Sequence, residues 1–195
     1  MKFVLATKNQ GKVKEMLALL GDLDIEMVLP SDVGVDLDVE ETGETFAENA
    51  LLKAKALCEA TGLTSIGDDS GLCVDALNGA PGVYSARYGG EELDDAGRYR
   101  LLLSSMRGQT TRQAHFQCQI ACAFPNGDVL TAEGRCEGAI AFAPMGTDGF
   151  GYDPVFLIPE LGKTFAQISS EEKNKRSHRG KALVTFAQKV KAYLG

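Results

Sequence analysis

The stretch MKFVLATKNQ GKVKEMLALL GDLDIEMVLP, residues 1–30, decides the fold class. Its apolar run from Phe3 to Ala6 is typical of a short buried strand, which ends where polar residues begin. Beyond Gly11 the apolar residues recur at helical spacing, at Val13, Met16, Leu17 and Leu20. Residues 25–29 then match a second strand, which Pro30 closes. The opening thirty residues therefore predict a β-α-β unit.

The remaining helices are indicated by the residues at their ends. Thr45 and Glu48 form a capping box, so a helix should start there and stop near Gly62. Residues 94–106 have a helical pattern, and a last helix should begin at Ser177 and run to about 194. Its apolar stripe predicts a face that packs on the core or forms a dimer contact, made up of Leu183, Phe186, Ala187, Val190 and Leu194.

The other strands are predicted from turn residues and apolar runs. Residues 112–124 and 128–142 flank Pro125-Asn126-Gly127 and predict a hairpin. Residues 65–67 and 72–74 bracket residues 68–71, which have the pattern of a turn at the end of a strand. Alternating strands and helices indicate an α/β fold, and the long hairpin makes the central sheet mixed. Helices should flank this long sheet.

Composition limits the class of protein. The 195 residues are 44% hydrophobic and show no linker or repeat, which predicts a single domain over residues 1–195. A formal net charge of −7 argues against nonspecific binding of nucleic acid. The N-terminal apolar run is too short for a signal peptide or a membrane span, so we expect a cytoplasmic protein. The five cysteines lack a C-x-x-C pair and should be buried, reduced thiols.

Charge is segregated along the chain. Residues 32–52 hold seven acids and no Lys or Arg, whereas residues 173–181 hold five Lys or Arg and no acid. Carboxylates bind a hard cation, and cationic side chains bind phosphate oxygens, so the two stretches together suit a metal-bound triphosphate. The alternative is a pair of solvated surfaces.

Three short segments carry candidate chemistry. Asp68-Asp69-Ser70-Gly71 offers carboxylates that could hold magnesium and orient or deprotonate water, unless it is a plain surface turn. Residues 7–12 lie where a strand meets a helix N-terminus, which attracts phosphate; a simple polar loop is the alternative. Residues 146–154 contain two aromatic rings among glycines, suited to stacking on a base or, alternatively, to a core turn.

Other nucleotide and hydrolase motifs are absent. Gly162-Lys163-Thr164 has Leu157 where a P-loop needs its first glycine. No Gly-x-Ser-x-Gly occurs, and His115, on a predicted strand, is expected to be structural.

In order and spacing, these segments resemble the inosine/xanthosine triphosphate pyrophosphatase family over nearly the whole chain. The matching motifs are residues 7–12, Glu40-Glu41-Thr42-Gly43, Thr45-Phe46, Glu48-Asn49-Ala50, Lys53, residues 68–71, 79–82 and 84–88, Phe150 to Pro154, and Ser177 to Gly180. Lys8 departs from the pattern, because the family often has a small residue there.

The resemblance implies an α/β protein of two lobes with the active site in the cleft between them, acting as a homodimer on a nucleoside triphosphate with Mg²⁺. It implies that Asp69 is the base for the attacking water, and that Glu40 or Glu41, together with Asp69, binds magnesium; the two glutamates are not distinguished. The substrate-binding residues that it implies are Thr7, Lys8, Asn9, Gln10, Gly11, Lys12, Lys53, Ser70, Phe150, Gly151, Tyr152, Asp153, Lys173, His178 and Arg179.

The expected reaction is hydrolysis of noncanonical purine triphosphates (ITP, dITP, XTP) to the monophosphate and pyrophosphate. Two other hypotheses stay open from the sequence: a nucleotide-binding module without catalysis, and a hydrolase that clears other modified nucleotides.

Overall fold

The computed structural model describes residues 1–195 and divides into two compact units. Unit 1 comprises residues 1–69, 118–134 and 178–195, and unit 2 comprises residues 70–117 and 135–177. The helices are α1 (Gln10–Leu20), α2 (Phe46–Thr61), α3 (Asp95–Ser105), α4 (Ser170–Arg176) and α5 (His178–Leu194). The strands are β1 (Lys2–Leu5), β2 (Glu26–Val28), β3 (Thr64–Val74), β4 (Gln113–Ala123), β5 (Val129–Ile140), β6 (Phe156–Ile158) and β7 (Lys163–Thr164).

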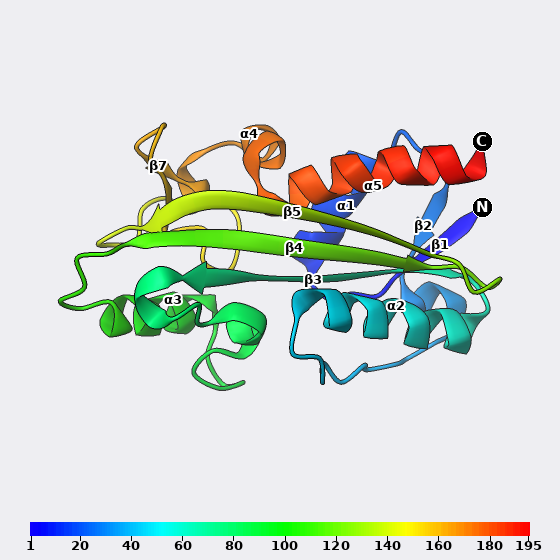
Figure 1. Cartoon of the computed structure of the whole chain (residues 1–195), viewed down its shortest axis with the longest axis horizontal. Helices are drawn as coiled ribbons and strands as arrows, with labels where there is room; N and C mark the ends of the chain where they lie inside the picture. Colours follow the sequence, from blue (N-terminus) through cyan, green and yellow to red (C-terminus); the bar gives the residue numbers. More distant parts are fainter. The chain divides into compact units, whose positions relative to one another are not determined.

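The strands form one seven-stranded sheet in the order β2-β1-β3-β4-β5-β6-β7. Strand β1 pairs in parallel with both β2 and β3, whereas β6 is antiparallel to β5 and β7. The α/β fold with a mixed sheet and flanking helices is therefore confirmed. The hairpin is confirmed as β4 and β5, joined through a tight turn at Gly127, which has a φ of +93° (Figure 1).

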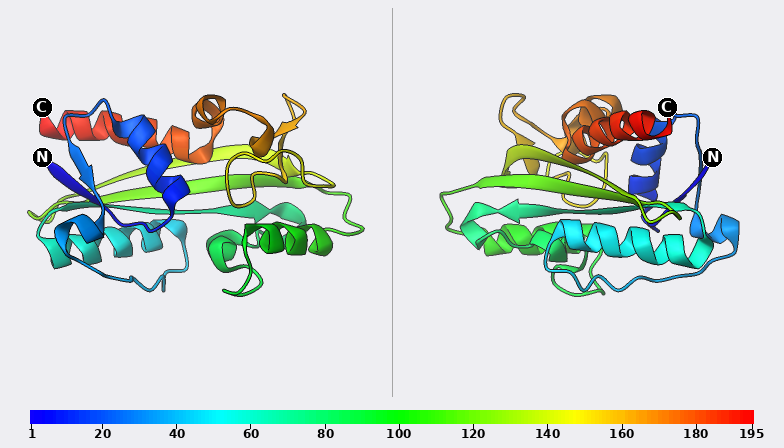
Figure 2. Two further views of the ribbon diagram at one scale, coloured as in Figure 1. Left: turned by 180° about the vertical axis from the view of Figure 1, so that it is seen from behind. Right: turned by 45° about the vertical axis from the view of Figure 1, so that its right-hand side comes forward.

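Unit 1 contains the predicted β-α-β opening as β1, α1 and β2. Helix α2 covers one face of the sheet, and α1 and α5 lie together on the other (Figures 1 and 2). The apolar faces of α1 and α5 meet strand residues in one core cluster that includes Met16, Cys118 and Phe186. Of the predicted stripe on α5, Leu183, Phe186 and Val190 are buried, but Leu194 is exposed because it lies at the helix end.

Helix α2 begins and ends as predicted. The Thr45 hydroxyl accepts a hydrogen bond from the Glu48 amide, and the Glu48 carboxylate accepts one from the Thr45 amide. Gly62 ends the helix with a φ of +68°. The helix approaches β3 closely, because a Cβ on Gly67 would lie 2.1 Å from the Ala50 carbonyl oxygen. This contact brings the start of α2 against the middle of β3.

The predicted turn at residues 68–71 is wrong. The segment lies inside the continuous strand β3, which runs from Thr64 to Val74 and is almost entirely buried. Its polar residues are typical of a turn. The buried carboxylates of Asp68 and Asp69 are instead compensated by partners remote in sequence, which local patterns do not show.

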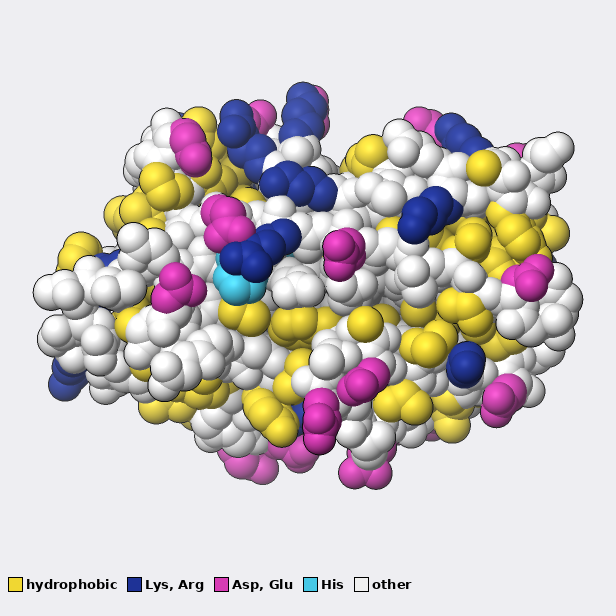
Figure 3. Space-filling model, in the orientation of Figure 1, with side chains coloured by type: hydrophobic (Ala, Val, Ile, Leu, Met, Phe, Trp, Pro, Cys, Tyr) yellow, Lys and Arg dark blue, Asp and Glu magenta, His cyan; other side chains and the backbone are white.

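Unit 2 has its own core, in which Phe156 contacts both Phe116 and Phe165. Helix α3, predicted from residue 94, lies on one face of this part of the sheet and α4 on the other (Figure 1). Helix α4 was not predicted, although Ser169 caps it, acids occupy its first turn and bases its last. Lys, Arg and acidic side chains lie close together over α4 in Figure 3, which agrees with the exposed pairs Lys175–Glu171 and Arg176–Glu172.

No helix has the length and apolar character required to cross a membrane. All five cysteines are free thiols, and four of them are buried, as expected; Cys73 is half-buried.

Candidate functional site

Asp68 and Asp69 occupy consecutive positions of β3, and their side chains serve opposite faces of the sheet. Successive residues of a strand alternate between faces. Asp68 binds Lys12 of α1 and Arg179 of α5, whereas Asp69 binds Asn49 of α2. These partners belong to the helices that cover the two faces of the sheet. The carboxylates of Asp68 and Asp69 therefore do not form a pair at a single site.

Asp68 is a fully buried anion held by two cations. Its Oδ1 forms an ion pair with Lys12 Nζ, and its Oδ2 lies 3.0 Å from Arg179 Nε. The Cys118 thiol also donates to Oδ2, at 3.1 Å. Burial alone would raise the pKa of Asp68, but Arg179 and Lys12 hold that pKa well below its ordinary value. Asp68 therefore stays ionised, with its oxygens already occupied.

Arg179 is equally enclosed. Its Nη1 lies 2.6 Å from Glu15 Oε2, so α1 contributes both a cation and an anion to this cluster. Arg179 is 2% exposed and Asp68 is 1% exposed. A chain of alternating charges, Lys12–Asp68–Arg179–Glu15, thus joins α1, β3 and α5. It fixes the first turn of α1, where residues 7–12 meet the helix.

Asp69 has a different environment. Its Oδ2 accepts a hydrogen bond from Asn49 Nδ2 at 3.1 Å, and its Oδ1 lies 3.7 Å from Lys53 Nζ. Burial raises the pKa of Asp69 and the neighbouring Glu41 adds to the rise, whereas Lys53, Lys12 and Asn49 oppose it without cancelling it. A carboxylate with a raised pKa is a better proton acceptor than an ordinary one. Asp69 is therefore the carboxyl of this pair suited to acid–base chemistry.

Asn49 connects Asp69 to the acidic segment. Its amide nitrogen donates to Asp69, and its amide oxygen accepts from the Gly43 backbone N–H at 2.8 Å. The residue is completely buried, so both ends of the amide are oriented. A Cβ on Gly43 would lie 2.6 Å from the Asn49 side-chain oxygen, which explains the glycine.

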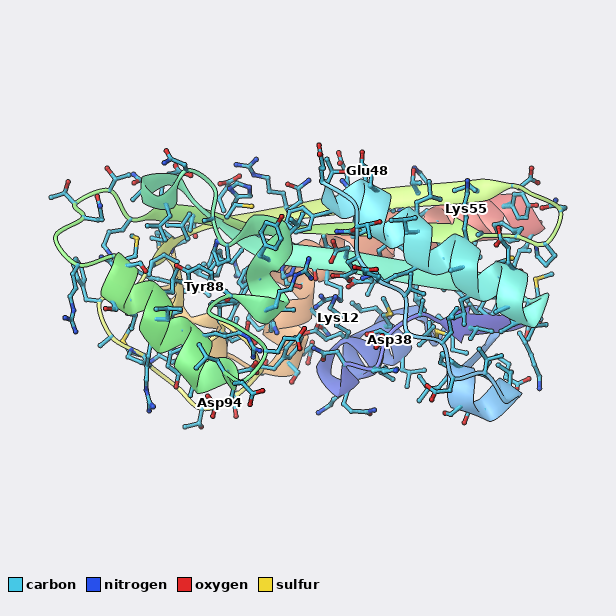
Figure 4. The ribbon with its side chains drawn as sticks, turned by 90° about the horizontal axis from the view of Figure 1, so that it is seen from below. Lys12, Asp38, Glu48, Lys55, Tyr88 and Asp94 are labelled. Atoms are coloured by element: carbon cyan, nitrogen blue, oxygen red, sulfur yellow. The ribbon has the colours of Figure 1, made fainter.

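The acidic stretch is not one surface. Glu41 lies 2.5 Å from Lys53 Nζ and so belongs to the Asp69 cluster, whereas the Glu40 side chain is exposed. Glu48 caps α2 and is labelled at its start in Figure 4. Asp36 and Asp38 face Lys8, at 3.6 Å and 4.0 Å. The structure thus brings Glu41, rather than Glu40, next to Asp69.

Residues 7–12 form the turn between β1 and α1. Asn9 caps the helix, its Oδ1 accepting from the Lys12 amide, and Thr7 Oγ1 accepts from the Asn9 amide. Gln10 and Gly11 begin α1. Thr7, Lys8 and Gln10 line a cavity of about 520 Å³ together with residues from 29 to 37. Lys12 and Asp38 are labelled near α1 in Figure 4. The segment presents a helix N-terminus with two lysines, a suitable arrangement for phosphate.

In unit 2, the segment 149–153 is held by Lys173. The Asp153 carboxylate accepts from Lys173 Nζ at 2.7 Å and from the Phe150 amide at 2.9 Å. The Lys173 ammonium also lies 4.5 Å from the centre of the Phe150 ring. Tyr152 is buried, donates its hydroxyl to the Ser85 carbonyl at 2.7 Å, and has a pKa raised chiefly by burial. Gly151 has a φ of +61°, which a side chain would strain.

The basic stretch is also divided. Lys173, Lys175 and Arg176 belong to unit 2, whereas His178 and Arg179 open α5 in unit 1. His178 is buried, and Ser70, the first residue of unit 2, is half-buried. His115 lies on β4, as predicted, and burial lowers its pKa.

No role was predicted from sequence for three residues of the unit 1 clusters, Asn49, Glu15 and Cys118, although Asn49 lies in the matching motif Glu48-Asn49-Ala50. Each makes a contact with a residue distant in sequence. Asn49 and Asp69 are 20 positions apart, and Cys118 and Asp68 are 50 positions apart. A further local signal was the polar Asn49 beside Ala50, at a position of α2 where the helical pattern expects an apolar residue.

Comparison with known proteins gives a consistent result. The sequence profile of the Ham1 family matches residues 3–189. A Desulforamulus reducens protein named dITP/XTP pyrophosphatase is 53% identical over 185 residues, covering 94% of this chain and 92% of its own. The solved Ham1 protein structure of Staphylococcus aureus superimposes with a TM-score of 0.90 at 41% identity, covering 99% of this chain and 100% of that one. The structure of a HAM1 protein from Coxiella burnetii superimposes with a TM-score of 0.91 at 42% identity. The match covers 98% of this chain and 99% of that one.

Proposed function

The chain belongs to the Ham1 family, and we propose from that premise that it hydrolyses noncanonical purine nucleoside triphosphates to the monophosphate and pyrophosphate. Relatives at about half identity over nearly the full chain carry the name dITP/XTP pyrophosphatase, which supports this reaction. The observation that carries the proposal is the contrast between the two carboxyls of β3. Asp68 is fixed as an anion by two cations, and Asp69 is kept as a buried proton acceptor.

In this reaction Asp69 accepts the proton of the water that attacks the α-phosphorus. Asn49 donates to Oδ2 of Asp69, and Oδ1 faces Lys53; we place the proton transfer at Oδ1, on the side of that lysine. No covalent intermediate is needed, because water is the nucleophile and pyrophosphate is the leaving group. Lys53 lies between Glu41 and Asp69 and is positioned to meet negative charge that develops on the phosphate oxygens.

Glu41 and Asp69 would hold a magnesium ion. Magnesium commonly takes one or two protein carboxylates and completes its coordination with water and substrate phosphates. Two carboxylates beside Lys53 fit that donor set, and no group of three or more potential ligands occurs. When bound, the ion would neutralise phosphate charge and lower the pKa of a coordinated water.

The remaining substrate contacts are proposed from the family resemblance and the local geometry. Residues 7–12 would bind the triphosphate at the N-terminus of α1, where Lys12 is already oriented by Asp68. Phe150 offers a ring for stacking on the base, and Lys173 restrains it. Donors from the His178–Arg179 region would select the 6-oxo group, apart from the Arg179 Nε and Nη1 atoms that Asp68 and Glu15 occupy. A 6-amino group would instead place one hydrogen-bond donor against another. A polar mismatch of that kind discriminates by roughly 10⁴ to 10⁵. Homodimerisation and the arrangement of the complete substrate site remain predictions.

The direct test is to measure released pyrophosphate and orthophosphate from ITP, dITP, XTP, GTP and ATP, with and without Mg²⁺. We expect pyrophosphate from the first three, dependence on the metal, and far slower turnover of ATP. Orthophosphate as the sole primary product would contradict the cleavage position. Tight binding of ITP with no product would show a binding module instead.

The metal ligand is tested by a matched pair of substitutions, Glu41→Gln and Glu40→Gln. Because Glu41 lies beside Lys53 and Glu40 is exposed, Glu41→Gln should lower kcat and raise the Mg²⁺ concentration needed for half-maximal rate. Glu40→Gln should change both values less than twofold. The opposite ranking would assign the metal to Glu40.

A further inference from the structure

The segment that carries Phe150 is restrained from a second side by an acid of α3. The Asp95 Oδ2 accepts a hydrogen bond from the Gly151 backbone N–H at 2.7 Å. Asp95 is 56 positions away in sequence and opens α3, directly after the capping residue Asp94. Arg98, one turn along the same helix, lies with its Nη1 3.8 Å from Asp95 Oδ1. One carboxylate oxygen thus faces the guanidinium, and the other faces the Gly151 amide.

The Gly151 amide needs such an anchor. Gly149 and Gly151 both have positive φ, at +75° and +61°, so the backbone on either side of Phe150 adopts conformations that no regular element maintains. The Phe150 amide is bound by Asp153, and the next amide along is bound by Asp95. The two carboxylates fix the two consecutive peptide groups that determine where the Phe150 ring lies.

The surroundings of this contact are open. A cavity of about 560 Å³ is lined by the start of α3 and by residues from the 147–154 segment, including Phe150 and Gly151. Segment 149–153 is therefore not tightly packed on the side of α3. The hydrogen bond from the Gly151 amide to Asp95 is a specific contact that restrains it there. Asp94, in contrast, uses its carboxylate within its own helix, where its Oδ1 accepts from the Gly97 amide at 2.7 Å.

We propose that Asp95 is a positioning residue for recognition of the nucleobase, acting through the Gly151 amide to hold the Phe150 ring. This rests on the proposed function in one respect, the stacking of Phe150 on a base. Asp95 itself does not touch the substrate. Its loss lets the 149–153 segment sample other conformations, so that part of the binding free energy is used to order the segment before the base can stack.

The experiment compares Asp95→Ala with Asp95→Asn, which keeps an acceptor oxygen, and with Asp94→Ala, which removes the helix cap instead. For ITP with Mg²⁺, Asp95→Ala should raise KM about 3- to 10-fold, the range expected for one partly exposed hydrogen bond, with kcat within about twofold. Asp95→Asn should recover at least half of that loss on a logarithmic scale. Asp94→Ala should lower Tm and leave KM unchanged.

Inorganic tripolyphosphate, which has no base, separates recognition of the base from binding of phosphates. As a competitive inhibitor it should have the same inhibition constant against Asp95→Ala as against the unsubstituted enzyme. An equal loss for ITP and tripolyphosphate, an unchanged KM, or the same KM increase in Asp94→Ala would overturn the proposal.

A readout independent of turnover is hydrogen exchange of the Gly151 amide, which should accelerate in Asp95→Ala and not in Asp94→Ala. If the unsubstituted chain releases no pyrophosphate, the proposed function fails separately, and calorimetric Kd values for ITP replace KM in the same comparison. No binding of ITP, or a Kd unchanged by Asp95→Ala, would overturn the role of Asp95.

Discussion

Asp68→Asn and Asp69→Asn should affect stability in opposite ways, although the residues are neighbours and the substitution is the same. Asp68 compensates two cations, Lys12 and Arg179, whose side chains are 16% and 3% exposed. A neutral amide leaves both cations without their shared anion. Burial already disfavours the charged form of Asp69. When Asp69 becomes neutral, Lys53 still has an ion-pair partner in Glu41, at 2.5 Å.

The magnitude follows from these environments. Removing one partner of a buried ion pair costs about 3–5 kcal/mol, because the other charge stays buried and uncompensated. For a chain of this length, about 2–4 °C of Tm is lost per kcal/mol, so Asp68→Asn should lower Tm by roughly 6–20 °C. Asp69→Asn should leave Tm within about 2 °C of its original value or raise it.

The pH dependence has a defined sign for each carboxyl. The folded-state pKa of Asp68 is lowered, so its stabilisation is present above its ordinary value of 3.8 and is lost as pH falls through the folded-state pKa. The folded-state pKa of Asp69 is raised, so its contribution is present below 3.8 and is lost as pH rises through the folded-state pKa. Any stability gained by Asp69→Asn should therefore appear at neutral pH and vanish below about pH 3.8.

Thermal unfolding followed by circular dichroism at pH 7 and pH 3.5 measures both effects, and pyrophosphate release from ITP measures activity on the same samples. Asp69→Asn should be folded and inactive. Equal losses of Tm for the two variants at pH 7 would refute the assignment of opposite electrostatic roles. A fully active Asp69→Asn would remove Asp69 from the mechanism.

Two further substitutions test the supports of the clusters. Gly67→Ala places a methyl group 2.1 Å from the Ala50 carbonyl oxygen, so α2 must move from β3; we expect a loss of about 1–3 kcal/mol in urea unfolding, and a loss near zero would contradict the close approach. Lys173→Met leaves the buried Asp153 carboxylate without its ammonium and should lower Tm by roughly 6–20 °C. Lys175→Met, its control, removes an exposed pair and should leave Tm unchanged; similar shifts for the two would show that burial is not the cause.

Local sequence signals predicted the elements whose stability is local. The Thr45–Glu48 capping box, the Gly62 helix end and the helical spacing after Gly11 each involve residues within a few positions of one another. Their capping hydrogen bonds and apolar spacings involve only neighbouring residues, so pattern and element coincide. The β-α-β opening and the hairpin were predicted from short-range patterns of the same kind, and the mixed sheet from the two together.

At residues 68–71 the local pattern predicted a turn, but this polar sequence lies in a buried strand. Burying Asp68 is favourable only because Lys12 and Arg179 arrive from helices 56 positions before and 111 positions after it, which no local window contains. Helix α4 was missed for a different reason, because its cap and its ion pairs are local. Its bases were interpreted as one cationic strip, whereas Lys175 and Arg176 pair with acids one turn earlier and Lys173 is buried.

Residue order and short spacings were enough to predict the class of fold, four of the five helices and the motifs that resemble one enzyme family. Three features became visible only in the folded chain: Asp68 and Asp69 serve opposite faces of β3, Glu41 rather than Glu40 lies beside Asp69, and Asp95 binds Gly151. The physical reason is that the ionisation and orientation of a side chain depend on neighbours brought close by folding, whatever their separation along the chain.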